Sequence, residues 1–293
     1  MARLRILYLG VPLGAEVLRR AGFAPVAMGL APLDLPGARR ARRRSGALVL
    51  GNPDLGDAGV RRVLASARPD VLFSFFFPRR IPPAVLELAP RGAFGTHPSL
   101  LPRWRGPDPY FWAIREGDAE SGVTLHRLEA EYDTGAVVAR RSIPLAPDED
   151  AWSLAKKLDR PALELLVDAA QRLEAGEVLA GEPQPTGVTW APRPDDEALA
   201  IDWREPATRV LAHVRAAAPE PGATAVFGDH WVEILAAERC QATAPAGLLP
   251  AEAWLTDAGW AVCCGEGAVI VRRARDEEGE PVDLDALFAS VAR

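Results

Sequence analysis

Two apolar runs in the first third of the chain limit the folds that it can adopt. Residues 71–77 read Val-Leu-Phe-Ser-Phe-Phe-Phe, and residues 93–96 lead directly into His97. Short apolar runs bounded by turn residues are typical of buried strands. Further strands are expected at 4–9, 23–30 and 47–50, and helices at 15–20, 57–67 and 82–88. This alternation predicts an α/β fold with a mostly parallel sheet covered by helices on both faces.

The segment after His97 is predicted to form a stiff loop at the carboxyl end of its strand. Pro98 and Pro102 fix φ and remove two backbone donors, so the chain must leave the sheet there. Ligands of parallel α/β sheets lie at the carboxyl ends of the strands. His97 is therefore a candidate for chemistry.

The remaining elements follow from turn residues and periodicity. A Pro- and Arg-rich loop is expected at 31–46, a helix at 107–116, and two antiparallel strands at 122–128 and 136–143 joined by a turn with Asp133. A helix begins near Asp148 to Asp150, restarts at Pro161 and ends at Gly176. A Pro-rich linker is expected at 181–198, followed by a helix at 206–217 and strands at 223–227, 230–235, 260–263 and 268–272.

Composition excludes several classes of protein. The 293 residues carry a formal net charge of −6, which argues against a surface that binds nucleic acid throughout. Three cysteines and four histidines show no zinc-ligand spacing. No apolar stretch approaches the roughly 20 residues that span a bilayer, and residues 1–10 do not resemble a secretion signal. We expect a cytoplasmic globular protein of two domains, the second rich in strands.

His97 and Asp133 are the pair that this arrangement places together. A histidine that titrates near neutral pH and is held by a carboxylate suits reactions in which an amine attacks a carbonyl and loses a proton. The residues thus indicate acyl transfer. A histidine at a strand end can instead have a purely structural role.

Long motifs around both residues resemble the family of 10-formyltetrahydrofolate-dependent formyltransferases, whose acceptors include methionyl-tRNA. The resemblance is carried by residues 92–106, 122–126 and 133–135, and in the C-terminal half by 201–203, 214–216 and 221–223. It implies a Rossmann-like catalytic domain at 1–182, a linker at 183–202 and a domain similar to oligonucleotide-binding (OB) folds at 203–293.

The resemblance also implies roles for individual residues. His97 would be the catalytic histidine, and Asp133 the carboxylate that assists proton movement. Tetrahydrofolate would meet the loop after the histidine and an aromatic wall, and no metal would be needed. The folate-binding residues would be Ser99, Leu100, Leu101, Pro102, Phe75, Phe76 and Phe77.

One position departs from the family. Formyltransferases carry an asparagine two residues before the histidine, where its amide donates to the developing oxyanion, and this chain has Gly95. Losing one such donor costs about 2.7–4 kcal/mol, or roughly 10²–10³ in rate. We expect a slow formyltransferase, in which charged His97 and a water replace the donor, or a relative that binds folate or RNA without transfer.

The sequence leaves the formyl acceptor open. Methionyl-tRNA is the first candidate, because the arginines of residues 39–44 resemble a basic loop that contacts the tRNA acceptor stem. These are Arg39, Arg40, Arg42, Arg43 and Arg44. A nucleotide-linked amino sugar or another small amine is the alternative, since residues 72–75 and 122–127 are equally similar to sugar N-formyltransferases. Hydrolysis of formyltetrahydrofolate is a third reaction.

Overall fold

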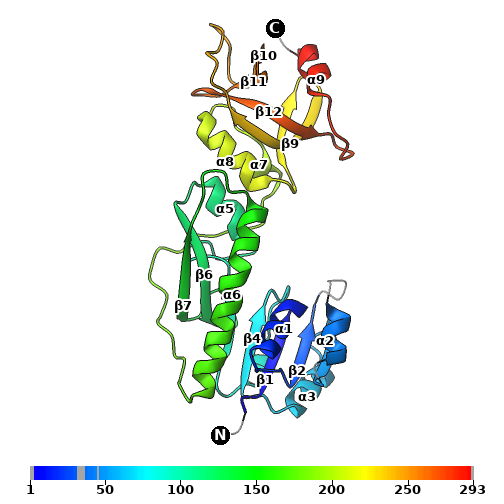
Figure 1. Cartoon of the computed structure of the whole chain (residues 1–293), viewed down its shortest axis with the longest axis vertical. Helices are drawn as coiled ribbons and strands as arrows, with labels where there is room; N and C mark the ends of the chain where they lie inside the picture. Colours follow the sequence, from blue (N-terminus) through cyan, green and yellow to red (C-terminus); the bar gives the residue numbers. More distant parts are fainter. Residues whose placement is uncertain (1–2, 32–36, 45, 292–293) are drawn as a thin grey trace. The chain divides into compact units, whose positions relative to one another are not determined.

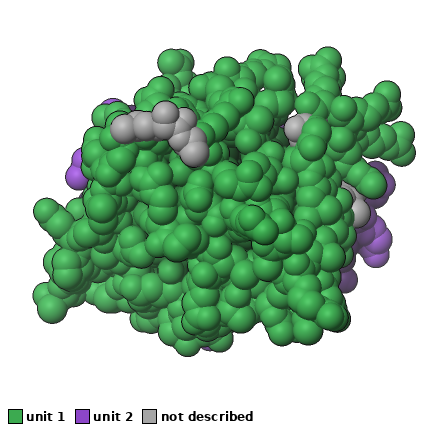
Figure 2. All heavy atoms as spheres, turned by 90° about the horizontal axis from the view of Figure 1, so that it is seen from below, with its two compact units in different colours: residues 1–106, 122–143, 157–190 green, residues 107–121, 144–156, 191–293 purple. Residues whose placement is uncertain are grey.

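The computed structural model describes residues 3–31, 37–44 and 46–291. The chain divides into two compact units, which Figure 2 colours separately. The first comprises residues 1–106, 122–143 and 157–190, and the second residues 107–121, 144–156 and 191–293. The contiguous domain bounds expected from the sequence stay a prediction.

Seven strands of the described chain form the sheet on which the first unit is built (Figure 1). They are β1 (Ile6–Gly10), β2 (Ala27–Leu30), β3 (Leu48–Gly51), β4 (Val71–Phe75), β5 (Ala93–His97), β6 (Glu120–Arg127) and β7 (Val137–Pro144). Their order is β3-β2-β1-β4-β5-β6-β7. The pairs from β3 to β5 are parallel, and β6 runs antiparallel to β5. The predicted mostly parallel α/β sheet is therefore confirmed.

Alternation along β1 shows how this sheet is covered on its two faces. Leu7 and Leu9 belong to a buried cluster with Leu64 of α3 (Ala58–Ser66) and Val85 of α4 (Pro83–Leu86). Tyr8 points to the opposite face, because successive strand residues alternate. There it lies against α1 (Pro12–Arg20), and its hydroxyl donates to the carbonyl oxygen of Val11 at 2.6 Å.

The loop expected at 31–46 is partly wrong, because α2 (Ala38–Arg44) is a helix. Ala38 and Ala41 lie one turn apart and are buried. The five arginines of α2 are exposed. Two small apolar residues are too few to reveal the helix among so many charges. Residues 32–36 of the predicted loop and residue 45 lie outside the described residues.

The helical break expected at Pro161 is also wrong, since α6 (Ala151–Glu174) passes through it. Proline inside a helix costs about 3 kcal/mol. Here Leu158, Leu165 and Leu166 are all at most 2% exposed, and burying each leucine contributes about 1.5–3 kcal/mol. Their burial offsets the cost. Within the described ranges, no helix has the length and hydropathy needed to cross a bilayer.

The second unit contains an antiparallel sheet of order β10-β11-β12-β9-β8. Its elements are β8 (Ala223–Phe227), β9 (His230–Arg239), β10 (Ala253–Thr256), β11 (Gly259–Cys263), β12 (Ala268–Arg275), α5 (Pro109–Arg115), α7 (Asp196–Leu199), α8 (Ala207–Ala217) and α9 (Leu284–Val291). Phe288 of α9 packs against Phe227 and Trp260, with ring centroids 4.9 and 5.6 Å away. The β-rich character is confirmed, whereas the sequence predicts none of α7, β10 and α9, and α7 begins inside the stretch expected to be an extended linker.

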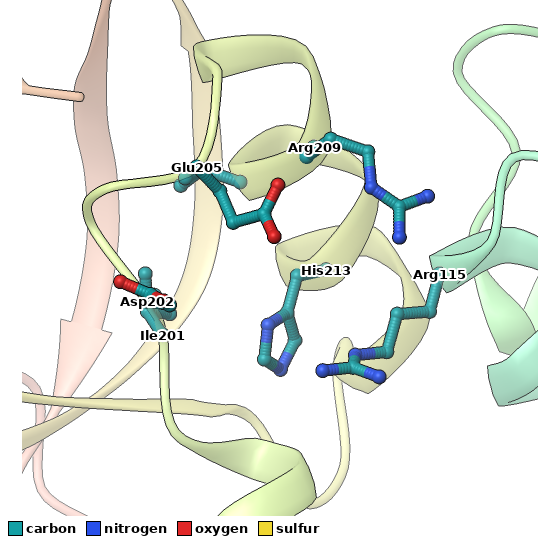
Figure 3. Close-up of a pocket in the computed structure, with 7 residues that line it drawn as sticks. Arg115, Ile201, Asp202, Glu205, Arg209 and His213 are labelled. Atoms are coloured by element: carbon teal, nitrogen blue, oxygen red, sulfur yellow. The ribbon is translucent and has the colours of Figure 1, made fainter. Parts of the chain in front are cut away.

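A small polar cavity of about 150 Å³ lies in the second unit beside His213 of α8 (Figure 3). Its two arginines, Arg115 and Arg209, share one carboxylate, that of Glu116, at 3.6 and 3.2 Å. His213 is 6% exposed, and its Nε2 has no hydrogen-bond partner among the described residues. Burial, and then the charge of Arg115, lower the pKa of His213 to about 4.

This histidine makes a testable contribution to the pH dependence of stability. Between pH 6.5 and about 4 the unfolded chain binds a proton at His213 that the folded chain does not. The free energy of unfolding should therefore fall by about 1.4 kcal/mol per pH unit on acidification through this window. His213→Phe should remove that part of the slope in urea unfolding at pH 7, 5.5 and 4.5. His230→Phe, at an exposed position, is the control, and an unchanged slope in His213→Phe would contradict the assignment.

Candidate active site

His97 is the last residue of β5 and is only 6% exposed. Its Nε2 lies 2.7 Å from the carbonyl oxygen of Trp104, and its Nδ1 lies 3.4 Å from Oδ1 of Asp133. A carbonyl oxygen only accepts, so Nε2 carries a hydrogen, and a proton on Nδ1 would face the carboxylate. The two predicted residues therefore lie together, in a geometry suited to exchanging a proton at Nδ1.

Asp133 reaches His97 only because the chain turns back after β6. His97 pairs with Thr124 near the start of β6, whereas Arg127 at its end pairs with Phe94. Residues 128–133 must therefore return towards His97. Asp133 itself adopts a left-handed φ of 58°, which aspartate tolerates better than most residues. Its Oδ2 accepts a hydrogen bond from the Gly106 amide at 3.0 Å.

The loop after His97 is held by hydrogen bonds to β6. The Thr124 hydroxyl accepts from the amide of Leu101 at 3.0 Å and donates to the carbonyl oxygen of Ser99 at 2.7 Å. The side chains of Ser99 and Leu101 are buried, while Leu100 and Pro102 are half-buried. The loop is thus stiff, as its prolines predict. Its contact with folate stays a prediction.

Gly95 lies directly across the sheet ladder from His126 and on the same face of β5 as His97. A Cβ atom built on Gly95 would approach Cδ2 of Leu128 to 2.8 Å. The end of the Leu128 side chain therefore occupies space next to residue 95, where the family resemblance implies an asparagine. A side chain at residue 95 would therefore have to displace the end of Leu128.

His126 is a site residue that the sequence did not reveal. Its Nδ1 lies 2.8 Å from the carbonyl oxygen of Arg127, and its Nε2 lies 3.8 Å from Oδ1 of Asp133. Burial, opposed by the nearby Asp133 charge, lowers the pKa of His126 to about 4, so the ring is neutral near pH 7. Strand alternation places residues 124, 126 and 128 on one face, but only the register with β5 shows that this face meets His97.

The three phenylalanines predicted to line the pterin pocket differ in their surroundings. Phe75 is 1% exposed and belongs to the interior, where its ring lies 4.5 Å from that of Phe76. Phe76 is 41% exposed, and Phe77 is half-buried beneath the guanidinium group of Arg79. A wall that meets a ligand would therefore use Phe76 and Phe77. Among the described side chains, no group of three or more His, Cys, Asp or Glu residues could hold a metal ion.

Two solved structures share the fold of this chain. HypX from Aquifex aeolicus in complex with tetrahydrofolic acid has a TM-score of 0.64 at 24% identity, and the match covers 99% of this chain and 47% of HypX. This chain therefore spans about half the length of HypX. An N-formyltransferase from Helicobacter canadensis, in complex with folinic acid and dTDP-3-aminofucose, has a TM-score of 0.69 at 16% identity, covering 92% of this chain and 99% of that enzyme.

Sequence comparison covers both halves of the chain. Residues 37–170 match the formyl transferase family, and residues 195–292 match the formyl transferase C-terminal domain. Methionyl-tRNA formyltransferase of Anaeromyxobacter dehalogenans is 33% identical over 95% of this chain and 94% of that protein. The Burkholderia thailandensis enzyme of the same name is 34% identical over 94% of this chain and 91% of its own length. The chain therefore belongs to the formyl transferase family.

Proposed function

We propose that this enzyme transfers the formyl group of 10-formyltetrahydrofolate to an amino group, with His97 and Asp133 as its proton-transfer pair. The observation that carries the proposal is the 3.4 Å approach of His97 Nδ1 to Asp133 Oδ1 at the end of β5. The amine would attack the formyl carbon and form a tetrahedral intermediate. The proton lost by the amine would pass through the pair to N10 of the folate, which leaves as the carbon–nitrogen bond breaks.

Holding both reactants in place accounts for much of the expected rate. Orientation of two bound reactants can lower a barrier by roughly 7–11 kcal/mol. The absence of the family asparagine at Gly95 would remove about 2.7–4 kcal/mol of oxyanion stabilisation. A charged His97 and a water molecule could compensate in part. A slow formyltransferase is thus consistent with the site, and Ser99, Leu100, Leu101 and Pro102 would contact the folate.

Methionyl-tRNA is the acceptor that we propose first. The two relatives named methionyl-tRNA formyltransferase match both halves of this chain and more than nine-tenths of its length. An amino sugar linked to a nucleotide is the second candidate, supported by the fold of the Helicobacter canadensis enzyme. We further propose that domains at 1–182 and 203–293 flank a linker at 183–202, and that the enzyme acts in the cytoplasm.

The deciding experiment offers 10-formyltetrahydrofolate with one acceptor at a time. Charged initiator methionyl-tRNA, a nucleotide-linked amino sugar and buffer alone would be compared by the appearance of formylated product and tetrahydrofolate. Formylated tRNA supports the first acceptor, and formylated sugar supports the second. Release of formate without an amine indicates hydrolysis. Folate binding without any turnover would contradict formyl transfer and favour a binding protein.

The arginines of α2 make a prediction about the tRNA acceptor. Arg42 and Arg43 are exposed, as are Arg39, Arg40 and Arg44. Such side chains can contact phosphates, and each contact releases counterions. The double change Arg42→Ala and Arg43→Ala should raise KM for methionyl-tRNA about tenfold at low salt and reduce its salt dependence. Arg62→Ala plus Arg68→Ala, two exposed arginines on and just after α3, is the matched control. Equal tRNA kinetics in all three proteins would contradict a role for α2.

A further inference from the structure

Gln184 lies within the segment that the sequence assigns to a linker, yet it binds the turn that carries Asp133. Its Nε2 donates to the carbonyl oxygens of Asp133 and Gly135, both at 2.8 Å. Two residues earlier, Glu182 and Val137 exchange backbone hydrogen bonds of 2.8 and 2.7 Å. This stretch is therefore fixed on the first unit beside the candidate active site.

Arg105 determines which way the Gln184 amide faces. The guanidinium group donates to Oε1 of Gln184 from Nη2 at 2.6 Å and from Nε at 3.1 Å. Because arginine only donates, the amide oxygen must face Arg105, and the NH₂ group must face the two carbonyl oxygens. A flipped amide would place donors against donors and acceptors against acceptors. The orientation therefore follows from the chemistry of its partners.

The residues on either side of Arg105 bind the catalytic pair itself. The carbonyl oxygen of Trp104 faces Nε2 of His97, and the amide of Gly106 donates to Oδ2 of Asp133. Three consecutive residues thus contact the histidine, the glutamine and the aspartate. Together with the approach of His97 to Asp133, these contacts form a closed ring that runs from His97 through residues 104–106 to Asp133 and back to His97.

The turn held by Gln184 has little freedom to adapt by itself. Asp133 has a left-handed backbone, and a Cβ atom at Gly135 would lie 1.9 Å from the carbonyl oxygen of Arg127. The turn therefore packs closely against β6. The carbonyl oxygens of Asp133 and Gly135 both accept hydrogen bonds from the Gln184 amide, and these contacts are part-buried.

We infer that Gln184, oriented by Arg105, is a positioning residue that fixes the Asp133 carboxylate relative to His97. The inference rests on the proposed formyl transfer for its kinetic consequence. Its structural consequence, a fixed Asp133 turn, does not depend on the reaction. Misplacing a catalytic group by about 1 Å can cost up to about 10²-fold in rate, so loss of this contact should be visible in kcat.

The test replaces the donor and keeps the shape. Gln184→Glu puts a carboxylate oxygen against two carbonyl oxygens, and kcat for formyl transfer should fall about tenfold with little change in KM for either substrate. Gln171→Glu, the same change at an exposed position of α6, is the matched control and should match the unchanged protein. Gln184→Met lacks the donor and adds no charge. It should give the same fall in kcat, and it replaces Gln184→Glu in the test if the glutamate variant does not fold.

A second measurement separates this inference from the proposed function. Exchange of the Gly106 amide hydrogen reports its bond to Asp133, and it should become faster in both Gln184 variants and remain unchanged in Gln171→Glu. If the unchanged protein formylates no amine, the proposed function fails, while faster Gly106 exchange would still support the role of Gln184. Unchanged kcat together with unchanged Gly106 exchange, or an effect on KM alone, would overturn the inference.

Discussion

Asp133→Asn should lower kcat for formyl transfer by about three orders of magnitude, with much smaller changes in KM. General acid–base catalysis contributes about 10²–10⁴ in rate, and an amide cannot stabilise a charged His97 as a carboxylate does. The 3.4 Å approach of the two side chains and the buried position of His97 make this interaction hard for solvent to replace. Steady-state rates with saturating formyl donor would measure the effect.

The control for this change lies in the same turn. Glu131→Gln removes one negative charge from an exposed side chain that pairs with Arg80, and it should leave kcat within about twofold. Thermal unfolding of both variants should match that of the unchanged protein, since asparagine keeps the shape of aspartate. An Asp133→Asn enzyme with nearly full activity would exclude this carboxylate from the proton-transfer step.

Gly95→Asn should raise kcat for formyl transfer, and the increase should reach up to about 10²-fold when the change is combined with Leu128→Ala. The asparagine would restore an oxyanion donor, and removing one such donor typically costs about 10²–10³ in kcat. Because Cδ2 of Leu128 would lie 2.8 Å from the new Cβ atom, Gly95→Asn alone must displace that side chain. Shortening Leu128 opens the space, so the double change should exceed the single one.

Two controls distinguish a new donor from a change in packing. Leu128→Ala alone opens the same space without an amide and should not raise kcat. Gly95→Ala adds the Cβ atom without a donor and should not raise it either. If the unchanged enzyme already turns over at ordinary rates and Gly95→Asn slows it, the site uses a different oxyanion donor, and the account based on the missing asparagine is wrong.

Sequence reasoning predicted the elements whose signals are local. The apolar runs at 71–77 and 93–96 are short and are followed closely by proline, and β4 and β5 lie where these runs predict. The turn at 133–135 was recognised from its Asp-Thr-Gly residues, and the two strands around it were also found. His97 and Asp133 lie close together, as the sequence predicts. The register of β6 with β5 shows in addition that residues 128–133 must turn back towards His97, which the sequence does not reveal.

Elements that depend on distant partners were not predicted. The α6 helix continues through Pro161 because leucines on both sides of the proline are buried. The known cost of proline inside a helix predicts a break there, because it does not include this burial. Gln184 is a polar residue among prolines, and its meaning comes from contacts with Arg105 and Asp133. His126 appeared to be an ordinary strand residue until the ladder placed it opposite Gly95. The register between strands that are far apart in the sequence cannot be read from any short stretch of residues.

The segment beyond α6 also bears on when the site is completed during synthesis. Besides Gln184, the hydroxyl of Thr189 accepts from the Trp104 amide at 2.8 Å, and the Arg105 amide donates to the Thr189 carbonyl oxygen at 2.9 Å. A nascent chain therefore cannot form these contacts to Trp104 and Arg105 until Gln184 and Thr189 have left the ribosome. A fragment that stopped at residue 182 would contain His97, Asp133 and the Thr124 contacts to the loop, and would lack the contacts made by Gln184 and Thr189.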